Sequence, residues 1–152
     1  MSYTKQEGQQ QLLDSIAQAS QEIGAGLAAL GEAHEQLDEQ AADRLEEQMF
    51  RPLQRAYALA CRTRADFASR NGMPAGELES QTRGHPGRGA KGFVEDAVQA
   101  LEQADATLSQ LQDSMLPVEV GDPELRAGLS SVRELIGQVP PAAREMLRTF
   151  GR

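Results

Sequence analysis

The chain has 152 residues, of which 39% are apolar, 25% charged and only 4% aromatic, and its formal net charge is −8. This length suits one domain whose core is built mainly from aliphatic side chains. A single cysteine excludes an intramolecular disulfide framework and a metal site built from several cysteines, and no apolar stretch approaches the roughly 18 residues of a membrane-spanning helix.

The first 40 residues predict a long amphipathic helix. Apolar and small residues recur there in alternating steps of four and three, as at the a and d positions of a coiled coil. The bulky column of this apolar stripe consists of Ile16, Ile23, Leu30 and Leu37. These residues are candidate interface residues, because the stripe can be a seam between two copies of the chain. It can equally be one wall of an intramolecular bundle, and the sequence leaves both alternatives open.

The long helix is expected to break or kink both near Gly31 and near Pro52; the alternative is an elongated, dimeric molecule. Proline lacks an amide N–H and clashes with the preceding helical turn, and glycine destabilises a helix interior. A straight helix over residues 4–49 would measure about 69 Å, far more than the radius of gyration of about 15 Å expected for a compact chain of this length. A second helix is expected to end at Asn71-Gly72.

Residues 71–92 contain six glycines and two prolines and predict a long glycine-rich loop. The loop belongs to the basic part of the chain, since residues 1–50, 51–92 and 93–152 have net charges of −8, +5 and −5. Arg83, Arg88 and Lys91 lie next to the start of the following predicted helix, where backbone amides and the helix dipole favour an anion. They are therefore candidate anion-binding residues. A flexible solvated loop is the simpler interpretation, and the basic segment can also pair with the acidic ones.

Helical periodicity resumes over residues 94–115 and is expected to stop at Pro117. Asp122 and Pro123 then predict the N-cap and the first residue of another helix. Two consecutive prolines at positions 140 and 141 are expected to end that helix, and a short C-terminal helix is expected to fold back as a lid. No segment alternates with the two-residue period of a strand, so the chain is predicted to be all-α.

The predicted architecture is a single domain over residues 1–152. It is an elongated antiparallel helical bundle of four main, heptad-patterned helices with a short C-terminal helix, and the glycine-rich loop over 71–92 connects two of the main helices.

The sequence contains no convergent set of catalytic or metal-binding residues. Di-iron helical bundles need Glu-x-x-His pairs, and neither His34 nor His85 has a glutamate three residues before it. His34 and Asp38 can meet on one helix face, although a partly exposed structural histidine is the simpler interpretation. Cys61 is expected to be a buried structural residue. We therefore expect no enzymatic activity and no cofactor.

These patterns favour a non-enzymatic protein that acts through protein–protein interaction, as a scaffold, adaptor or chaperone-like molecule, and that forms a homodimer. The alternative is binding of an anionic ligand or a membrane surface by the basic region 51–92. The net negative charge argues against nucleic acid as a partner, because phosphate neutralisation dominates that affinity. The first residues have neither the charged nor the apolar region of a signal peptide, so a cytoplasmic location is expected.

Overall fold

The computed structural model describes residues 4–78 and 88–150. These residues form helices, turns and irregular segments but no strand, which confirms the predicted all-α bundle. The helical elements are α1 (Lys5–Glu35), α2 (Glu39–Leu45), the π-helical turn η1 (Glu46–Phe50), α3 (Arg51–Arg70), α4 (Ala90–Asp113), α5 (Leu116–Glu119), α6 (Pro123–Gly137) and α7 (Val139–Phe150). Among them, none is both long and apolar enough to cross a lipid bilayer.

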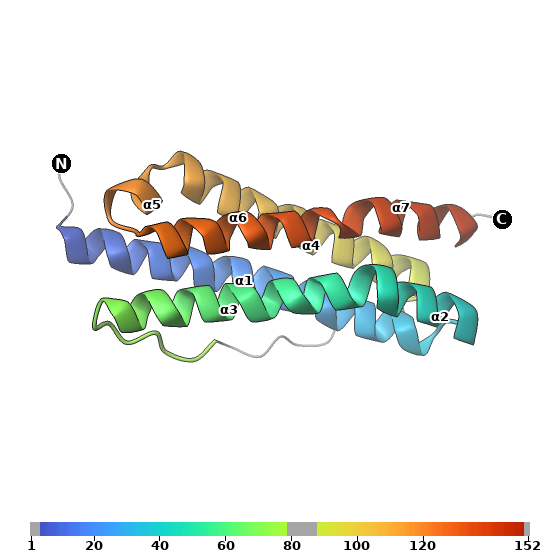
Figure 1. Ribbon diagram of the computed structural model, residues 1–152. Helices are drawn as coiled ribbons and strands as arrows, with labels where there is room; N and C mark the ends of the chain where they lie inside the picture. Colours follow the sequence, from blue (N-terminus) through green and yellow to red (C-terminus); the bar gives the residue numbers. More distant parts are fainter. Residues whose placement is uncertain (1–3, 79–87, 151–152) are drawn as a thin grey trace.

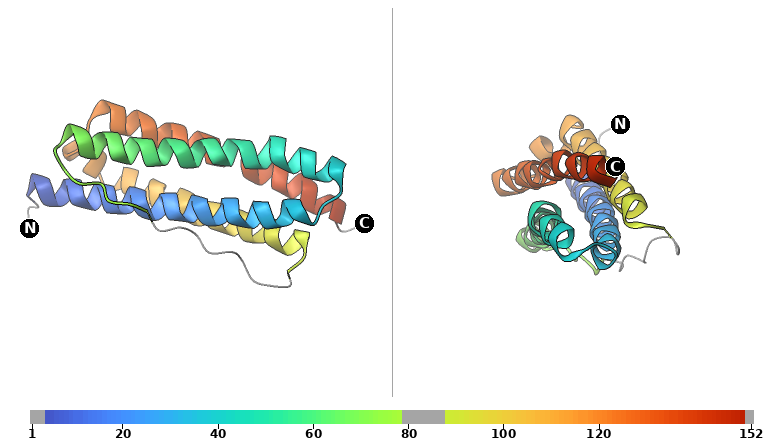
Figure 2. Two further views of the ribbon diagram at one scale, coloured as in Figure 1. Left: turned by 90° about the horizontal axis from the view of Figure 1, so that it is seen from below. Right: turned by 90° about the vertical axis from the view of Figure 1, so that its right-hand side faces the viewer.

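The helices lie along one long axis (Figure 1) and occupy four corners around it in the end-on view of Figure 2. α2, η1 and α3 run back beside α1, α4 runs in the same direction as α3, and α6 and α7 follow one another in the direction of α1. α1 packs against α3 and α4, and α6 also packs against α3 and α4. Neighbouring helices are therefore antiparallel, whereas α3 and α4 are parallel and lie at diagonally opposite corners (Figure 2).

The first helix continues through Gly31 and ends at Glu35, so the break expected near Gly31 lies about one turn further along the chain. Buried apolar residues on both sides of this glycine offset its helix penalty of about 1 kcal/mol. The chain instead turns just before Asp38, whose carboxylate accepts a hydrogen bond from the Ala41 amide at 2.8 Å. This N-cap starts α2 and fixes the position of the turn.

The break or kink predicted at Pro52 is replaced by a local change of helix type. Residues Glu46–Phe50 form a π-helical turn in which the Arg51 amide donates to the Glu46 carbonyl. A wider turn accommodates the proline ring and its missing N–H, so the backbone stays helical from α2 into α3. α3 ends where the sequence predicts, because Gly72 adopts the left-handed φ of 63° that stops a helix.

The apolar stripe of α1 faces the core of the bundle. Three members of its bulky column have no exposed surface, namely Ile16, Ile23 and Leu30. Leu37 is half-buried and packs against the same core. Gly26 is one of the small residues that alternate with this bulky column. A Cβ at this position would lie 3.3 Å from the Leu53 side chain of α3 and 3.4 Å from the Leu101 side chain of α4. The sequence leaves open whether this stripe is a seam between two copies or one wall of an intramolecular bundle. In the structure the stripe is buried within one chain, as a wall of the bundle.

The C-terminal helix does not fold back as a lid. α7 starts directly after α6 and continues in the same direction (Figure 1). Pro140 and Pro141 lie in its first turn, where the amide of a residue has no helical partner and its loss is harmless. The buried side of α7, made of Val139, Ala143 and Met146, completes the core next to α4.

The N-cap of α6 also joins this helix to α3. Asp122 accepts a hydrogen bond from the Leu125 amide at 2.8 Å, and its two carboxylate oxygens each lie 2.9 Å from a nitrogen of Arg70. The hydrogen bond from Arg70 lowers the pKa of Asp122 below its ordinary value. The hydrogen bond from the Leu125 amide and the positive charges of Arg70 and Arg126 make smaller contributions in the same direction.

Replacing Asp122 with asparagine is expected to keep the helix cap but lose the ion pair, which lowers the free energy of unfolding by about 0.5–1 kcal/mol near neutral pH. The pKa of the carboxylate is lower in the folded state, so its stabilisation is present above the unfolded-state pKa and disappears as pH falls through the folded-state pKa. Urea unfolding of the unmodified protein and of Asp122→Asn, at acid and at neutral pH, measures this difference in the free energy of unfolding. A difference that stays constant down to strongly acid pH would contradict the assignment.

Candidate functional site

The helices of the bundle carry very different charges. α3 has five arginines and one aspartate, for a net charge of +4. α1 and α4 each have one lysine and five carboxylates, for a net charge of −4 each. The positive charge that the sequence places in its middle third is therefore gathered in large part on one helix, at the corner diagonally opposite α4 (Figure 2).

Two of the five α3 arginines are used inside the fold. Arg64 is only 9% exposed and donates to the backbone carbonyls of Leu13 at 3.2 Å, of Gly76 at 3.3 Å and of Ala75. It ties the segment after α3 to the bundle. Arg70 pairs with the carboxylates at the start of α6. These two side chains stabilise the fold and leave no charge free for a partner.

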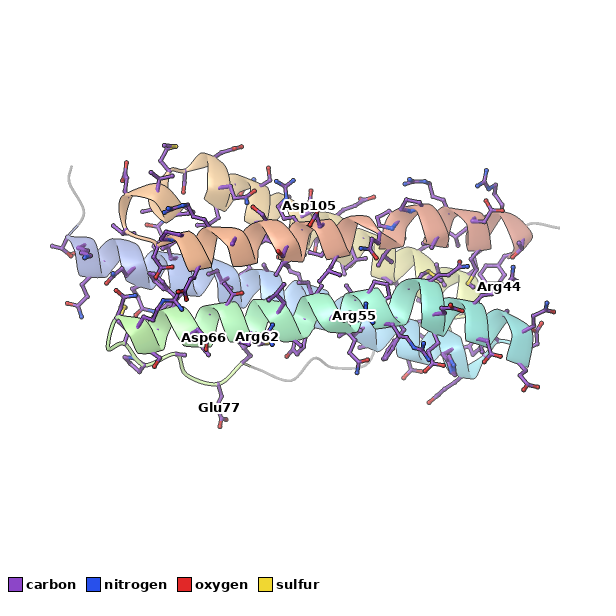
Figure 3. The ribbon with its side chains drawn as sticks, in the orientation of Figure 1. Arg44, Arg55, Arg62, Asp66, Glu77 and Asp105 are labelled. Carbon is purple, nitrogen blue, oxygen red and sulfur yellow. The ribbon has the colours of Figure 1, made fainter. Side chains whose placement is uncertain are left out.

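The other three α3 arginines, Arg51, Arg55 and Arg62, are exposed to solvent. Within residues 4–78 and 88–150, their guanidinium groups form no ion pair and no hydrogen bond. Steps of four and seven residues place them within about 40° of one another around the helix, in a row about 16 Å long. Figure 3 labels Arg55 and Arg62 along one side of α3. We call these three residues the arginine ridge.

The ridge stands on a helix that is held firmly against α6. Arg62 borders a groove of about 160 Å³ between the two helices, which Asp66 and Gly128 also line. A Cβ added to Gly128 would lie 2.5 Å from the Thr63 hydroxyl oxygen, so only glycine permits this close approach of the helices. The ridge arginines therefore project from a rigid support, which reduces the entropy lost on binding.

The candidate anion-binding residues do not form a site in the described part of the chain. Arg83 lies outside the described residues. The guanidinium of Arg88 lies 3.1 Å from the Asp96 carboxylate and donates to the Gly92 carbonyl at 3.1 Å. Lys91 is exposed in the first turn of α4, which begins at Ala90 and so takes up the last residues of the predicted loop. The charge of Arg88 is already compensated within the fold.

The other residues that the sequence singles out, His34, Asp38 and Cys61, have surroundings typical of structural residues. His34 is exposed in the last turn of α1, whereas Asp38 caps the next helix, so the two do not share a helix face. Cys61 is half-buried rather than buried, and it lies beside Tyr57, whose pKa is raised by burial and by Cys61. Over the described ranges, no three histidine, cysteine or acidic side chains are grouped so that they could hold a metal ion.

Comparison with known protein families, with characterised proteins and with solved structures finds no match for this chain. The candidate functional site therefore rests on the arginine ridge. Sequence reasoning missed the ridge because it grouped the basic residues by segment and not by helix face. The signal was present in the spacing of Arg51, Arg55 and Arg62, which share one face of any continuous helix.

Proposed function

We propose that this protein is a non-enzymatic binding module that docks an acidic segment of a partner protein on the arginine ridge. The supporting observation is a row of three exposed arginines, without an ion pair to any residue of 4–78 or 88–150, on a helix of charge +4 in a chain of net charge −8. Arg51 and Arg55 are four residues apart, where like charges destabilise a helix by about 0.2–0.5 kcal/mol. Carboxylates of a partner would relieve this repulsion, and each guanidinium can bind one carboxylate with two hydrogen bonds.

An acidic protein segment suits the ridge better than a membrane or a nucleic acid. Lipid-binding polybasic clusters use about 4–8 basic residues, and nucleic-acid binders contact about 6–10 phosphates. The ridge supplies three arginines, and the neighbouring helix α1 has a net charge of −4. An extended polyanion that continued beyond the ridge would meet the negative charge of α1, whereas a short acidic segment matches the ridge length of about 16 Å.

The test uses a fluorescein-labelled helical peptide with glutamates in steps of four and seven residues. We expect the full-length protein to bind this peptide at about 20 mM salt and to release it as salt rises. Replacing Arg51, Arg55 and Arg62 together with glutamine should weaken binding by about tenfold, because an exposed ion pair contributes about 0.2–1 kcal/mol. Fluorescence anisotropy measures the two dissociation constants.

A matched control replaces Lys5, Arg144 and Arg148 with glutamine, which removes the same formal charge elsewhere. This control should bind the peptide within about twofold of the unmodified protein, since screening limits the influence of distant charges. Equal losses in both variants, or no binding by the unmodified protein at low salt, would contradict the proposal. Stronger binding to phosphatidylserine vesicles or to duplex DNA than to the peptide would contradict the choice of a protein partner.

A further inference from the structure

The outer face of α4 carries an acidic row that complements the arginine ridge. Glu95 and Glu102 are exposed and seven residues apart, and in the described part of the chain neither forms an ion pair. Their separation along the helix axis is about 10 Å, and Arg55 and Arg62 are separated by the same number of residues on α3. Lys91 lies one turn before Glu95 on the same face of α4.

From this match we infer that the acidic partner of the arginine ridge is a second copy of this chain, which docks the outer face of α4 on α3. The inference rests on the proposed function of the ridge and names its partner.

An antiparallel arrangement of α3 from one copy and α4 from the other pairs three charges of α3 with opposite charges and leaves Arg51 opposite the uncharged Ala106. When Arg62 faces Glu95, Arg55 faces Glu102 seven residues further on. In the same register, Asp66 of α3 faces Lys91 of α4. A parallel arrangement that pairs Arg55 with Glu95 places Arg51 against Lys91 instead, and these like charges repel. The charge pattern therefore selects the antiparallel arrangement.

The position of the two helices determines the type of assembly. α3 and α4 lie at diagonally opposite corners of the bundle, so one copy cannot use both faces toward the same neighbour (Figure 2). The contact is therefore heterologous, and each added copy leaves one ridge and one acidic face free. The copies form a row in which the bundle direction alternates, and the length of the row depends on protein concentration and on salt.

Sedimentation velocity on the full-length protein tests this inference. At about 20 mM salt the average mass should rise with concentration above the 16.5 kDa of one chain, and at about 0.5 M salt it should return to that value. The double variants Arg55→Gln/Arg62→Gln and Glu95→Gln/Glu102→Gln should each stay at the mass of one chain. An equimolar mixture should form dimers of one copy of each and nothing larger, because only one ridge and one acidic face remain intact.

Zero-length carbodiimide cross-linking tests the arrangement. Because Asp66 and Lys91 lie on diagonally opposite helices, an amide link between them forms only between copies, and we expect it at low salt and not at high salt. An unmodified protein that stays at the mass of one chain at millimolar concentration and low salt, or double variants that associate as it does, would overturn the inference. If the protein does not self-associate but its ridge still binds the acidic peptide, the proposed function stands and only the second copy as partner is ruled out. If the protein neither self-associates nor binds the peptide, the inference and the proposed function are both contradicted.

Discussion

Replacing Ile23 with aspartate is expected to unfold the bundle, with a fall in the free energy of unfolding of more than about 4 kcal/mol. Ile23 has no exposed surface and belongs to the apolar core. A carboxylate at this position would be buried without a counter-ion, or would have to take up a proton and remain a poorly satisfied polar group. The loss is comparable to the whole stability of many domains, which is about 5–15 kcal/mol.

Urea unfolding followed by circular dichroism measures this loss, and two variants serve as controls. Gln18→Asp places the same charge on the exposed side of α1, four residues from both Asp14 and Glu22, and should lower the free energy of unfolding by only about 1 kcal/mol. Ile23→Val should cost about 0.5–1.5 kcal/mol. An Ile23→Asp protein that keeps its helices and its thermal stability but changes from dimer to monomer would show that the stripe joins two chains, and would contradict the intramolecular core.

Replacing Arg64 with alanine is expected to lower the free energy of unfolding by about 2–4 kcal/mol, because it removes donors to three backbone carbonyls together with buried side-chain volume. Two of these carbonyls belong to Ala75 and Gly76, in the segment that follows α3. Because Arg64 donates hydrogen bonds to both carbonyls, the segment that contains them should leave the bundle surface in the Arg64→Ala protein. Limited proteolysis should then cut between Met73 and Leu78 many times faster than in the unmodified protein.

The variant Arg64→Met separates the two contributions, because it restores most of the volume but supplies no donor. We expect rapid cleavage of the segment in this variant as well, with a smaller loss of stability than in Arg64→Ala. If Arg64→Met is cleaved as slowly as the unmodified protein, the hydrogen bonds of Arg64 do not hold the segment.

The parts of the fold that sequence predicts correctly have a local cause. Asp122 and Pro123 start α6 because the side chain of the first and the fixed φ of the second act within one turn. Asn71 and Gly72 end α3 for a similarly local reason. The periodicity of the apolar residues indicates the all-α class because it records which side of each helix is buried.

The parts that sequence predicts wrongly are places where two local signals compete. The apolar pattern runs through Leu37 without a gap, so the end of α1 at Glu35 is decided by the cap that Asp38 gives to α2. The effect of Pro52 depends on the π-helical turn before it. Pro140 and Pro141 interrupt a periodicity in the sequence, yet they begin a helix that continues along α6.

The candidate site required three-dimensional information for a different reason. Sequence identifies a basic segment but does not say which of its charges are already paired. Arg64 is buried against carbonyls, Arg70 pairs with Asp122, and Arg88 lies against Asp96. Only after these are assigned does the arginine ridge stand out as a basic row of α3 with no ion pair in the described part of the chain.

If the protein acts as we propose, the arginine ridge is the surface that recognises carboxylates. The most direct measurement is a nuclear magnetic resonance titration of the full-length protein with the acidic peptide, which follows the arginine Nε–Hε signals. We expect progressive shifts of the signals from Arg51, Arg55 and Arg62 and of amides along α3, while the signals of Arg133 and Arg144 stay in place. Shifts concentrated on α6 or α7, with the three ridge signals unchanged, would contradict the proposal.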